Sequence, residues 1–363
     1  MDVAGWQLID ESVRDEIAEE VHTAVAAGRH GFERVVRGVI ETWMDEVEDQ
    51  DLLDEAIRGV VAEEFAGHLA AQDGWPAVTD NDRLSLAMGE LAMAGILARE
   101  HHTCCMSCGI AEIGREISGL SGVRGYVFYH EQDVERAVAG GGIHLAFGPS
   151  ELGGGRKRGR GGGIGGEIVE VLRRRGLHVE WSGDDGQRIH VRVNWQRRRF
   201  GRLAEHPGTA GGGEPGQGLL VTFCDPSWAA GDEPVVMSAQ ESRDLLLRLT
   251  PRDGAFASYE GASGSVLQFA WEGGTRLWAE TPDAAAGCSH GRHVTLDEGL
   301  AMIAVLVEEG RIGLRDLGEL EEVSWSWRVS PRIRRAGGAA KPEPPGPFAT
   351  VGRLTRFMAN RYL

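Results

Sequence analysis

The sequence lacks the features that mark membrane and secreted proteins. No run of about 18 apolar residues occurs in the 363-residue chain, so we predict no membrane-spanning helix. The opening segment "MDVAGWQLIDESVRDE" is acidic and has no positively charged stretch followed by an apolar one, so we expect no secretory signal. Both absences favour a cytoplasmic protein.

Cysteine is also scarce, with five residues in the chain. They are Cys104, Cys105, Cys108, Cys224 and Cys288. An odd, clustered set in a chain without a secretory signal does not fit a framework of structural disulfides. The sequence therefore predicts reduced thiols, three of them within five consecutive positions.

Basic residues are rare near the amino terminus. Of the net charge of −17, residues 1–100 contribute −16, from 23 acidic and 7 basic residues. Residues 153–202 carry 13 basic and 5 acidic residues (+8), and residues 328–363 carry 8 and 1 (+7). This patterning indicates pairing between segments, or a solvated acidic surface that repels nucleic acid. Binding of nucleic acid by the arginine-rich segments is the weaker alternative.

The amino-terminal hundred residues have helical periodicity. Three apolar stripes with a spacing of three to four residues begin at Val13, Phe32 and Leu53. A fourth helix is predicted to open at Thr79 or Asp80, which suit the N-cap position, and to run through Ile96. We therefore expect an acidic helical region over residues 1–100.

The period then changes to a mixture of strands and helices. Strands are predicted at 125–130 and 142–148, and each is followed by a helix, at 131–139 and 164–176. Two more strands follow, in "LHVEWSG" and "RIHVRVNW". The order predicts a small α/β sheet domain over residues 101–204. Its glycine- and arginine-rich insertion at 153–163 has the composition of a mobile segment and no assignable role.

Residues 205–218 have the composition of a linker, and residues 219–328 are predicted to form a carboxy-terminal α+β domain. Capping boxes at Ser238 and Thr295 open two helices, and Gly273 and Gly274 lie in a predicted hairpin turn. Trp271, Trp278, Trp325 and Trp327 are expected to be core residues rather than an exposed interface. Residues 329–363 form a basic linker and a closing helix in this interpretation, and the fold class is α+β.

The segment "HHTCCMSCG" carries the sharpest chemical signal. Cys105 and Cys108 have the C-x-x-C spacing at which two thiolates hold one zinc ion, and Cys104 and His130 are the further ligands we consider. Adjacent cysteines point in different directions, which argues against Cys104 and Cys105 sharing an ion. A second interpretation packs the small cysteines under the sheet. A third is disulfide exchange, but no strand is predicted before the motif, as a thioredoxin-like context requires.

A catalytic alternative uses the same region. His130 and Asp133 lie at a predicted junction between strand and helix, where a histidine base could activate a cysteine nucleophile. Asp133 serves equally well as the acidic residue of the first helical turn. Residues 159–167 match a glycine-rich phosphate motif only in part, and a flexible insertion is favoured there.

The stretches "CCMSCG", "GYVFYHEQD" and "GLHVEWSGDDGQRIHV" resemble an uncharacterised family of domains common in actinobacteria. The likeness covers roughly residues 75–195 and implies a shared fold without an established activity. The domain after the linker resembles small α+β immunity proteins that neutralise polymorphic toxins. That likeness rests on "SVLQFAW", the hairpin and the helix "VTLDEGLAMIAVLVEEG".

The sequence shows no convincing nucleophile–base pair and no cofactor fingerprint. The favoured hypothesis is therefore a non-enzymatic protein-interaction or regulatory module with a structural cysteine turn, which either packs in the core or is stabilised by zinc. A thiol- or metal-dependent enzyme using Cys105, Cys108 and His130 is one alternative. A toxin-neutralising, immunity-type protein is the other.

Overall fold

The computed structural model describes residues 5–150, 163–208, 218–227, 229–283, 285–313 and 317–324. The chain divides into two compact units, residues 1–217 and 218–363. Within the described ranges, no helix combines the length and the apolar character needed to cross a membrane.

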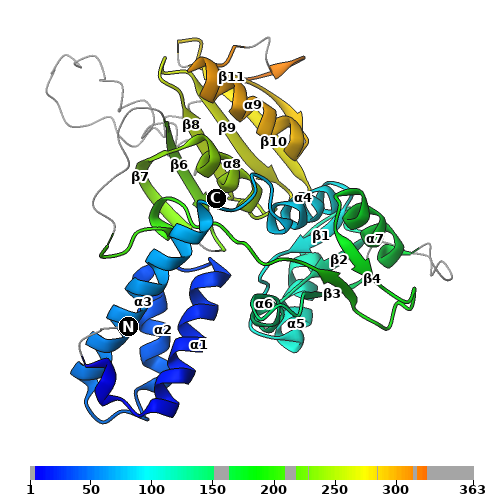
Figure 1. The fold of residues 1–363 in the computed structure, drawn as a ribbon. Coiled ribbons are helices and arrows are strands. Elements are labelled where there is room, and N and C mark those ends of the chain that lie inside the picture. The colour runs from blue at the N-terminus through cyan, green and yellow to red at the C-terminus, as the bar shows by residue number, and fades with distance from the viewer. Residues whose placement is uncertain are drawn as a thin grey trace, which may run out of the picture. The chain divides into compact units, whose positions relative to one another are not determined.

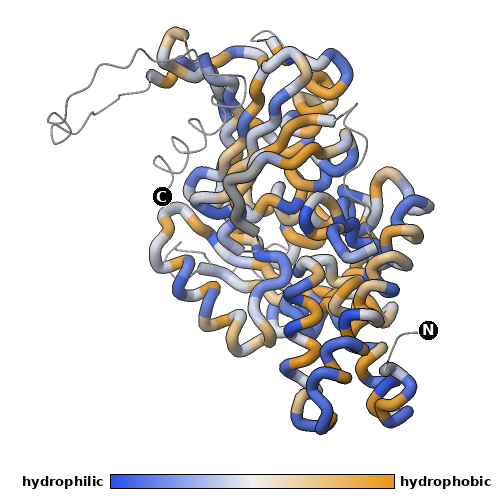
Figure 2. Tube along the Cα trace, turned by 90° about the vertical axis from the view of Figure 1, so that its left-hand side faces the viewer, coloured by the Kyte–Doolittle hydropathy of each residue, from blue (hydrophilic) through white to orange (hydrophobic). Residues whose placement is uncertain are grey.

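The first unit opens with three helices that pack on one another (Figure 1). They are α1 (Glu11–Ala27), α2 (Phe32–Trp43) and α3 (Gln50–Gln72), preceded by the short helix η1 (Trp6–Leu8). Asp10 caps α1 by accepting a hydrogen bond from the Ser12 amide, and Gly28 ends it in the left-handed conformation. Hydrophilic and hydrophobic residues alternate along these helices (Figure 2), and residues such as Ile17, Phe65 and Leu53 form a fully buried core.

The fourth predicted helix ends earlier than its apolar pattern indicates. Helix α4 spans Asp80–Met93, and Thr79 caps it in a capping box with Asp82. Gly95 then has a positive φ of 81°, and Ile96 begins strand β1 (Ile96–Arg99). The extension of the helix to Ile96 was therefore wrong, because the glycine turns the chain into the sheet.

The first unit contains a five-stranded sheet with the order β1-β2-β3-β5-β4. The other elements are α5 (Met106–Ser118), β2 (Gly125–Phe128), α6 (Glu131–Val138), β3 (Ile143–Pro149), α7 (Ile164–Arg174), β4 (His178–Glu180), β5 (Ile189–Arg192) and η3 (Gly201–Leu203). Strands β1 and β2 are parallel, and the other neighbouring pairs are antiparallel. The sequence predicted β2 to β5 and missed β1.

Different helices pack on the two faces of this sheet. Side chains of α4, α6 and α7 form one buried cluster with alternate residues of the strands, including Val127 and Leu145. On the opposite face, α5 packs Ile113 and Ile117 against Phe128. The two-residue period of the strands thus separates two cores.

An arginine joins the bundle to the end of the sheet region. Arg199 is almost fully buried, and its Nε donates to the Val25 carbonyl at 3.0 Å. Its Nη1 donates to the carbonyls of His30 (2.8 Å) and Leu203 (2.7 Å). The guanidinium carbon lies 4.1 Å from the centre of the Phe65 ring. Arg199 therefore joins the last turn of α1 to His30, which follows it, and to Leu203 in η3.

The two arginines that precede Arg199 form ion pairs with acidic side chains from residues 1–100. Arg197 lies 2.8 Å from Glu100, and Arg198 lies 3.1 Å from Asp82. Both arginine side chains are largely buried. This is the pairing between oppositely charged segments that the charge pattern indicates.

The second unit is built on a seven-stranded antiparallel sheet with the order β12-β11-β10-β9-β8-β6-β7. Its elements are β6 (Leu219–Asp225), β7 (Ala229–Met237), α8 (Ala239–Arg248), β8 (Phe256–Glu260), β9 (Val266–Glu272), β10 (Arg276–Asp283), β11 (Cys288–Val294), α9 (Leu296–Glu309) and β12 (Glu321–Ser324). Helices α8 and α9 contact each other and the sheet. The unit confirms the predicted α+β class.

Several local predictions for this unit are confirmed. Ser238 and Thr295 form the predicted capping boxes, and β9 pairs with β10 across the glycine turn. Trp271 and Trp278 are buried. Trp325, Trp327, the closing helix and most of the 153–163 insertion lie outside the described residues.

Candidate functional site

The cysteine turn lies between two parallel strands. It connects β1 to α5, and α5 leads to β2, which pairs with β1 in parallel. Cys105 is the N-cap residue of α5, and Cys108 lies in the first turn of that helix. A strand therefore does precede the C-x-x-C motif, and the objection raised against the disulfide-exchange hypothesis was wrong.

Two left-handed residues shape the turn. His101 has φ 49° and Thr103 has φ 65°, values that side chains other than glycine rarely adopt. Backbone hydrogen bonds hold this conformation, from the His102 amide to the Tyr129 carbonyl (2.8 Å) and from the Glu131 amide to the Thr103 carbonyl (3.1 Å). The turn is thus fixed to the end of β2 and the start of α6.

The three cysteines of the turn come together. The sulfur atoms of Cys104, Cys105 and Cys108 all lie within 4.8 Å of one another. The expectation that adjacent cysteines diverge was wrong, because the turn directs both sulfurs to one point. Cys104 and Cys108 are exposed and Cys105 is half-buried, which contradicts the hypothesis that these cysteines pack under the sheet.

At the first turn of α5, the thiols of Cys105 and Cys108 have different pKa values. A hydrogen bond from the Cys108 backbone, followed by those from Ser107 and the neighbouring thiols, lowers the pKa of Cys105 to about 7. Hydrogen bonding and charge from Cys104 and Cys105 raise the pKa of Cys108 to about 11. Amide groups at the start of a helix favour a thiolate at the Cys105 position.

Two contacts place α5 on the sheet. A methyl group at Gly109 would come within 2.4 Å of the Phe128 ring, so glycine permits the close approach of helix and strand. Arg99 Nε donates to the Glu116 carboxylate at 2.8 Å, and both side chains are largely buried. The glycine after Cys108 was the only sequence signal for this close packing.

His130 does not join the group of three sulfur atoms within 4.8 Å of one another. Its ring is buried, and its Nε2 is 3.2 Å from the Asp133 carboxylate. Among the described residues, its Nδ1 has no hydrogen-bond partner. Burial lowers the pKa of His130. The predicted His130–Asp133 pair is formed, but His130 is enclosed whereas Cys104 and Cys108 are exposed.

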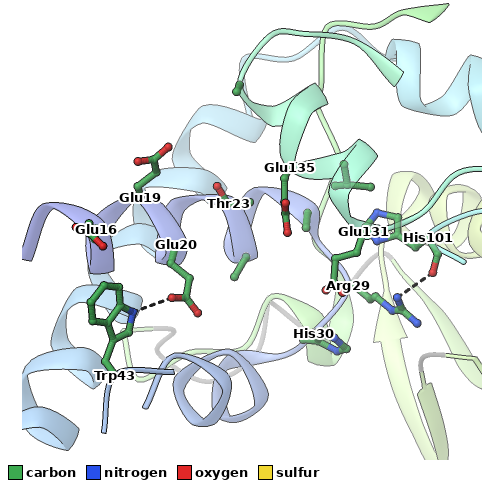
Figure 3. A pocket seen from close by; sticks show the side chains of 14 residues that line it. Glu16, Glu19, Glu20, Thr23, Arg29, His30, Trp43, His101, Glu131 and Glu135 are labelled. Carbon is green, nitrogen blue, oxygen red and sulfur yellow. Dashed lines mark hydrogen bonds between the residues drawn. The ribbon is translucent and has the colours of Figure 1, made fainter. Parts of the chain in front are cut away.

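A cavity of about 510 Å³ lies between α1 and α6 (Figure 3). Glutamates line much of it: Glu16, Glu19, Glu20, Glu131 and Glu135. Trp43 donates its Nε1 to Glu20 at 2.7 Å, and Arg29 donates to the His101 carbonyl at 2.9 Å (Figure 3). No sequence pattern indicates this cavity, because its walls come from segments about a hundred residues apart.

The cavity carries an excess of negative charge. Burial and the nearby Glu131 raise the pKa of Glu135. Burial, followed by the charges of nearby arginines, lowers the pKa of His30 to about 4, so this histidine is neutral at pH 7. A cationic group is therefore the electrostatically favoured occupant.

Comparisons with known proteins place the first unit in a family. No curated protein and no solved structure matches the chain. A family model matches residues 10–199, a longer stretch than the predicted 75–195. The match begins at Asp10, the cap of α1, and ends at Arg199, which binds the last turn of α1. The chain therefore belongs to the family described as a domain of unknown function, DUF6891.

Proposed function

We propose that the first unit is a metal-binding module that holds a zinc-class ion with the thiolates of Cys104, Cys105 and Cys108. The observation that supports this proposal is the convergence of three sulfur atoms within 4.8 Å at the start of α5. Disulfide exchange needs two sulfurs, whereas three convergent thiolates are a ligand set for zinc and other soft metal ions.

The surroundings of the turn suit a bound cation. The low pKa of Cys105 provides one thiolate near neutral pH. A metal ion would remove the repulsion that raises the pKa of Cys108. Because His130 is enclosed and faces Asp133, the proposal leaves the fourth coordination position to water or to a donor from a partner.

Cobalt(II) titration of the reduced full-length chain tests the proposal. We expect a thiolate-to-cobalt charge-transfer band that is strongly reduced in the Cys105→Ser, Cys108→Ser variant and retained in a Cys224→Ser control. Zinc should displace the cobalt and remove the band. An unchanged band in the double variant would contradict the assignment to this turn.

Disulfide exchange is a second candidate, and the parallel β1–α5–β2 arrangement with C-x-x-C at the start of the helix favours it. In this reaction the Cys105 thiolate attacks a partner disulfide and releases one partner thiolate. Cys108 then displaces the second partner thiolate and closes a Cys105–Cys108 disulfide, so that the partner is reduced and the motif is oxidised. Stoichiometric reduction of a model disulfide by the reduced, metal-free protein, lost in Cys105→Ser, would favour this candidate.

A regulatory or protein-interaction role in the cytoplasm remains part of the proposal. All five cysteines are free thiols, which agrees with a reducing compartment. For the immunity-type hypothesis of the second unit, Trp271 offers no contact surface to a toxin, because it is buried as the sequence predicts. A partner is therefore sought first at the metal turn of the first unit.

A further inference from the structure

We propose a second metal site, in the second unit, formed by Cys288, His290 and Glu322. The ligand atoms of these three side chains lie within 4.8 Å of one another. The site lies outside the matched family region, and it does not depend on the cysteine turn.

The register of the sheet creates this arrangement. Cys288 and His290 are two residues apart on β11, so their side chains lie on the same face of the strand. Glu322 lies on β12 directly opposite His290 in the antiparallel pair. Opposed residues in a sheet share a face, so the backbone brings all three side chains to one face of the β11–β12 pair.

The donor set suits a zinc-class ion. It combines one thiol, one imidazole and one carboxylate, all common zinc ligands. The sulfur of Cys288 is 3.7 Å from Nε2 of His290, so the two donors on β11 already lie side by side. Three protein ligands leave a fourth position open to water or an exogenous ligand.

The charge around the thiol also favours a cation. The carboxylates of Glu322 and Asp283 place negative charge around the Cys288 sulfur. Cys288 is buried, His290 is half-buried and Glu322 is exposed. An ion could therefore enter from the Glu322 side and reach the buried sulfur.

A bound ion would link the last described strand to the sheet. Strand β12 is four residues long and pairs with β11 alone among the described strands. Short edge strands have few hydrogen bonds of their own. A bond from the ion to Glu322 would fix β12 against β11, so metal loading should reduce hydrogen exchange in residues 321–324.

The test uses the full chain with Cys104, Cys105 and Cys108 all changed to serine, so that the first site is removed. We expect this variant to bind about one equivalent of cobalt(II) with a thiolate-to-cobalt charge-transfer band. Adding Cys288→Ser should abolish the band, because the only thiolate ligand is lost. Adding Glu322→Gln should weaken cobalt binding at least about 10-fold. Adding Cys224→Ser instead should leave both band and affinity unchanged.

The triple cysteine-to-serine variant also tests the second metal site independently of the first. If the triple variant is folded and shows no charge-transfer band, the second site is refuted whatever the cysteine turn binds. A band that persists in the Cys288→Ser variant would refute it equally. Should Cys288→Ser fail to fold, Glu322→Gln answers the question, because Glu322 is exposed and its change leaves the core intact.

Discussion

Cys105 is the residue on which the chemistry of the turn depends. Its pKa of about 7 predicts that alkylation by iodoacetamide in the metal-free protein rises with pH around a midpoint near 7. Cys108, with a pKa of about 11, should react far more slowly at neutral pH. Mass spectrometry of partly alkylated protein measures both rates. Equal labelling of the two thiols at pH 7 would contradict this assignment.

Ser107 offers a milder test of the same electrostatics. Its hydroxyl oxygen lies 3.7 Å from the Cys105 sulfur, and this contact is one of the causes of the low pKa. Ser107→Ala should therefore raise the alkylation midpoint of Cys105 while leaving the fold unchanged, because Ser107 is exposed. An unchanged midpoint would contradict a contribution of Ser107 and assign the low pKa to the Cys108 backbone and the neighbouring thiols.

Gly109 permits α5 to pack on β2. Gly109→Ala should destabilise the first unit by about 2 kcal/mol, because the new methyl group would overlap the Phe128 ring. Gly114→Ala in the same helix is the matched control, since that position is open. It should stabilise by up to about 1 kcal/mol through helix propensity. Urea unfolding of both variants measures the contrast, and equal effects would contradict the packing account.

At the residue scale, the sequence shows which groups are present but not where they point. The thiol cluster was visible from spacing, whereas the convergence of Cys104 with Cys105 was not. The turn that carries these cysteines has positive φ angles at His101 and Thr103. Residues other than glycine rarely adopt such angles, so the sequence does not predict the turn. The burial of His130 was equally hidden, because it depends on packing of the completed fold.

At the scale of elements, Arg199 connects the end of α1 to the segment after β5. Arg199→Met should destabilise the first unit by about 3 kcal/mol, because several buried carbonyls would lose a charged donor. Arg58→Met is the control. Arg58 pairs with Glu33 on the surface, so its loss should cost at most about 1 kcal/mol. Chemical denaturation distinguishes the two, and similar losses would refute the special role of Arg199.

The stability of the first unit should depend on pH through two histidines that lie near Arg199. Burial, followed by nearby arginine charges, lowers the pKa values of His30 and His68 to about 4. Between pH 4 and 6.5 the unfolded chain binds more protons than the folded one, so stability falls as the pH decreases through this range. Replacing both histidines by glutamine should flatten this part of the stability profile. A profile identical to that of the wild type would contradict the prediction.

Helices and turns that are marked by capping or glycine residues close in sequence were predicted correctly. Caps and turns such as Thr79, Ser238 and the glycines after β9 act on neighbouring residues, so the sequence displays them. Strand β1 was missed because its apolar run continues the helical pattern of α4. Its identity depends on parallel pairing with β2, about thirty residues later in the chain.

At the scale of the whole molecule, two compact units predict two unfolding events. Each unit has its own sheet with its own buried side chains. Arg199→Met should therefore lower the midpoint of one calorimetric transition and leave the other unchanged. A single transition that shifts as a whole would show that the units unfold together.

The range of the family match agrees with this division. It ends at Arg199 and includes both the helical bundle and the sheet of the first unit. The sequence likeness stopped at residue 75 on its amino-terminal side, because helical stripes are common to many proteins and carry little family information. The contacts of Arg199 with α1 give a physical reason why bundle and sheet belong to one domain.

The metal content of the full chain, purified without chelators, distinguishes a metal site from a metal-free turn. If the cysteine turn binds metal, the wild type holds about one equivalent more zinc than the Cys105→Ser, Cys108→Ser variant, with Cys224→Ser equal to the wild type. Equal zinc in the wild type and the folded double variant would contradict the proposal that the cysteine turn is a metal site.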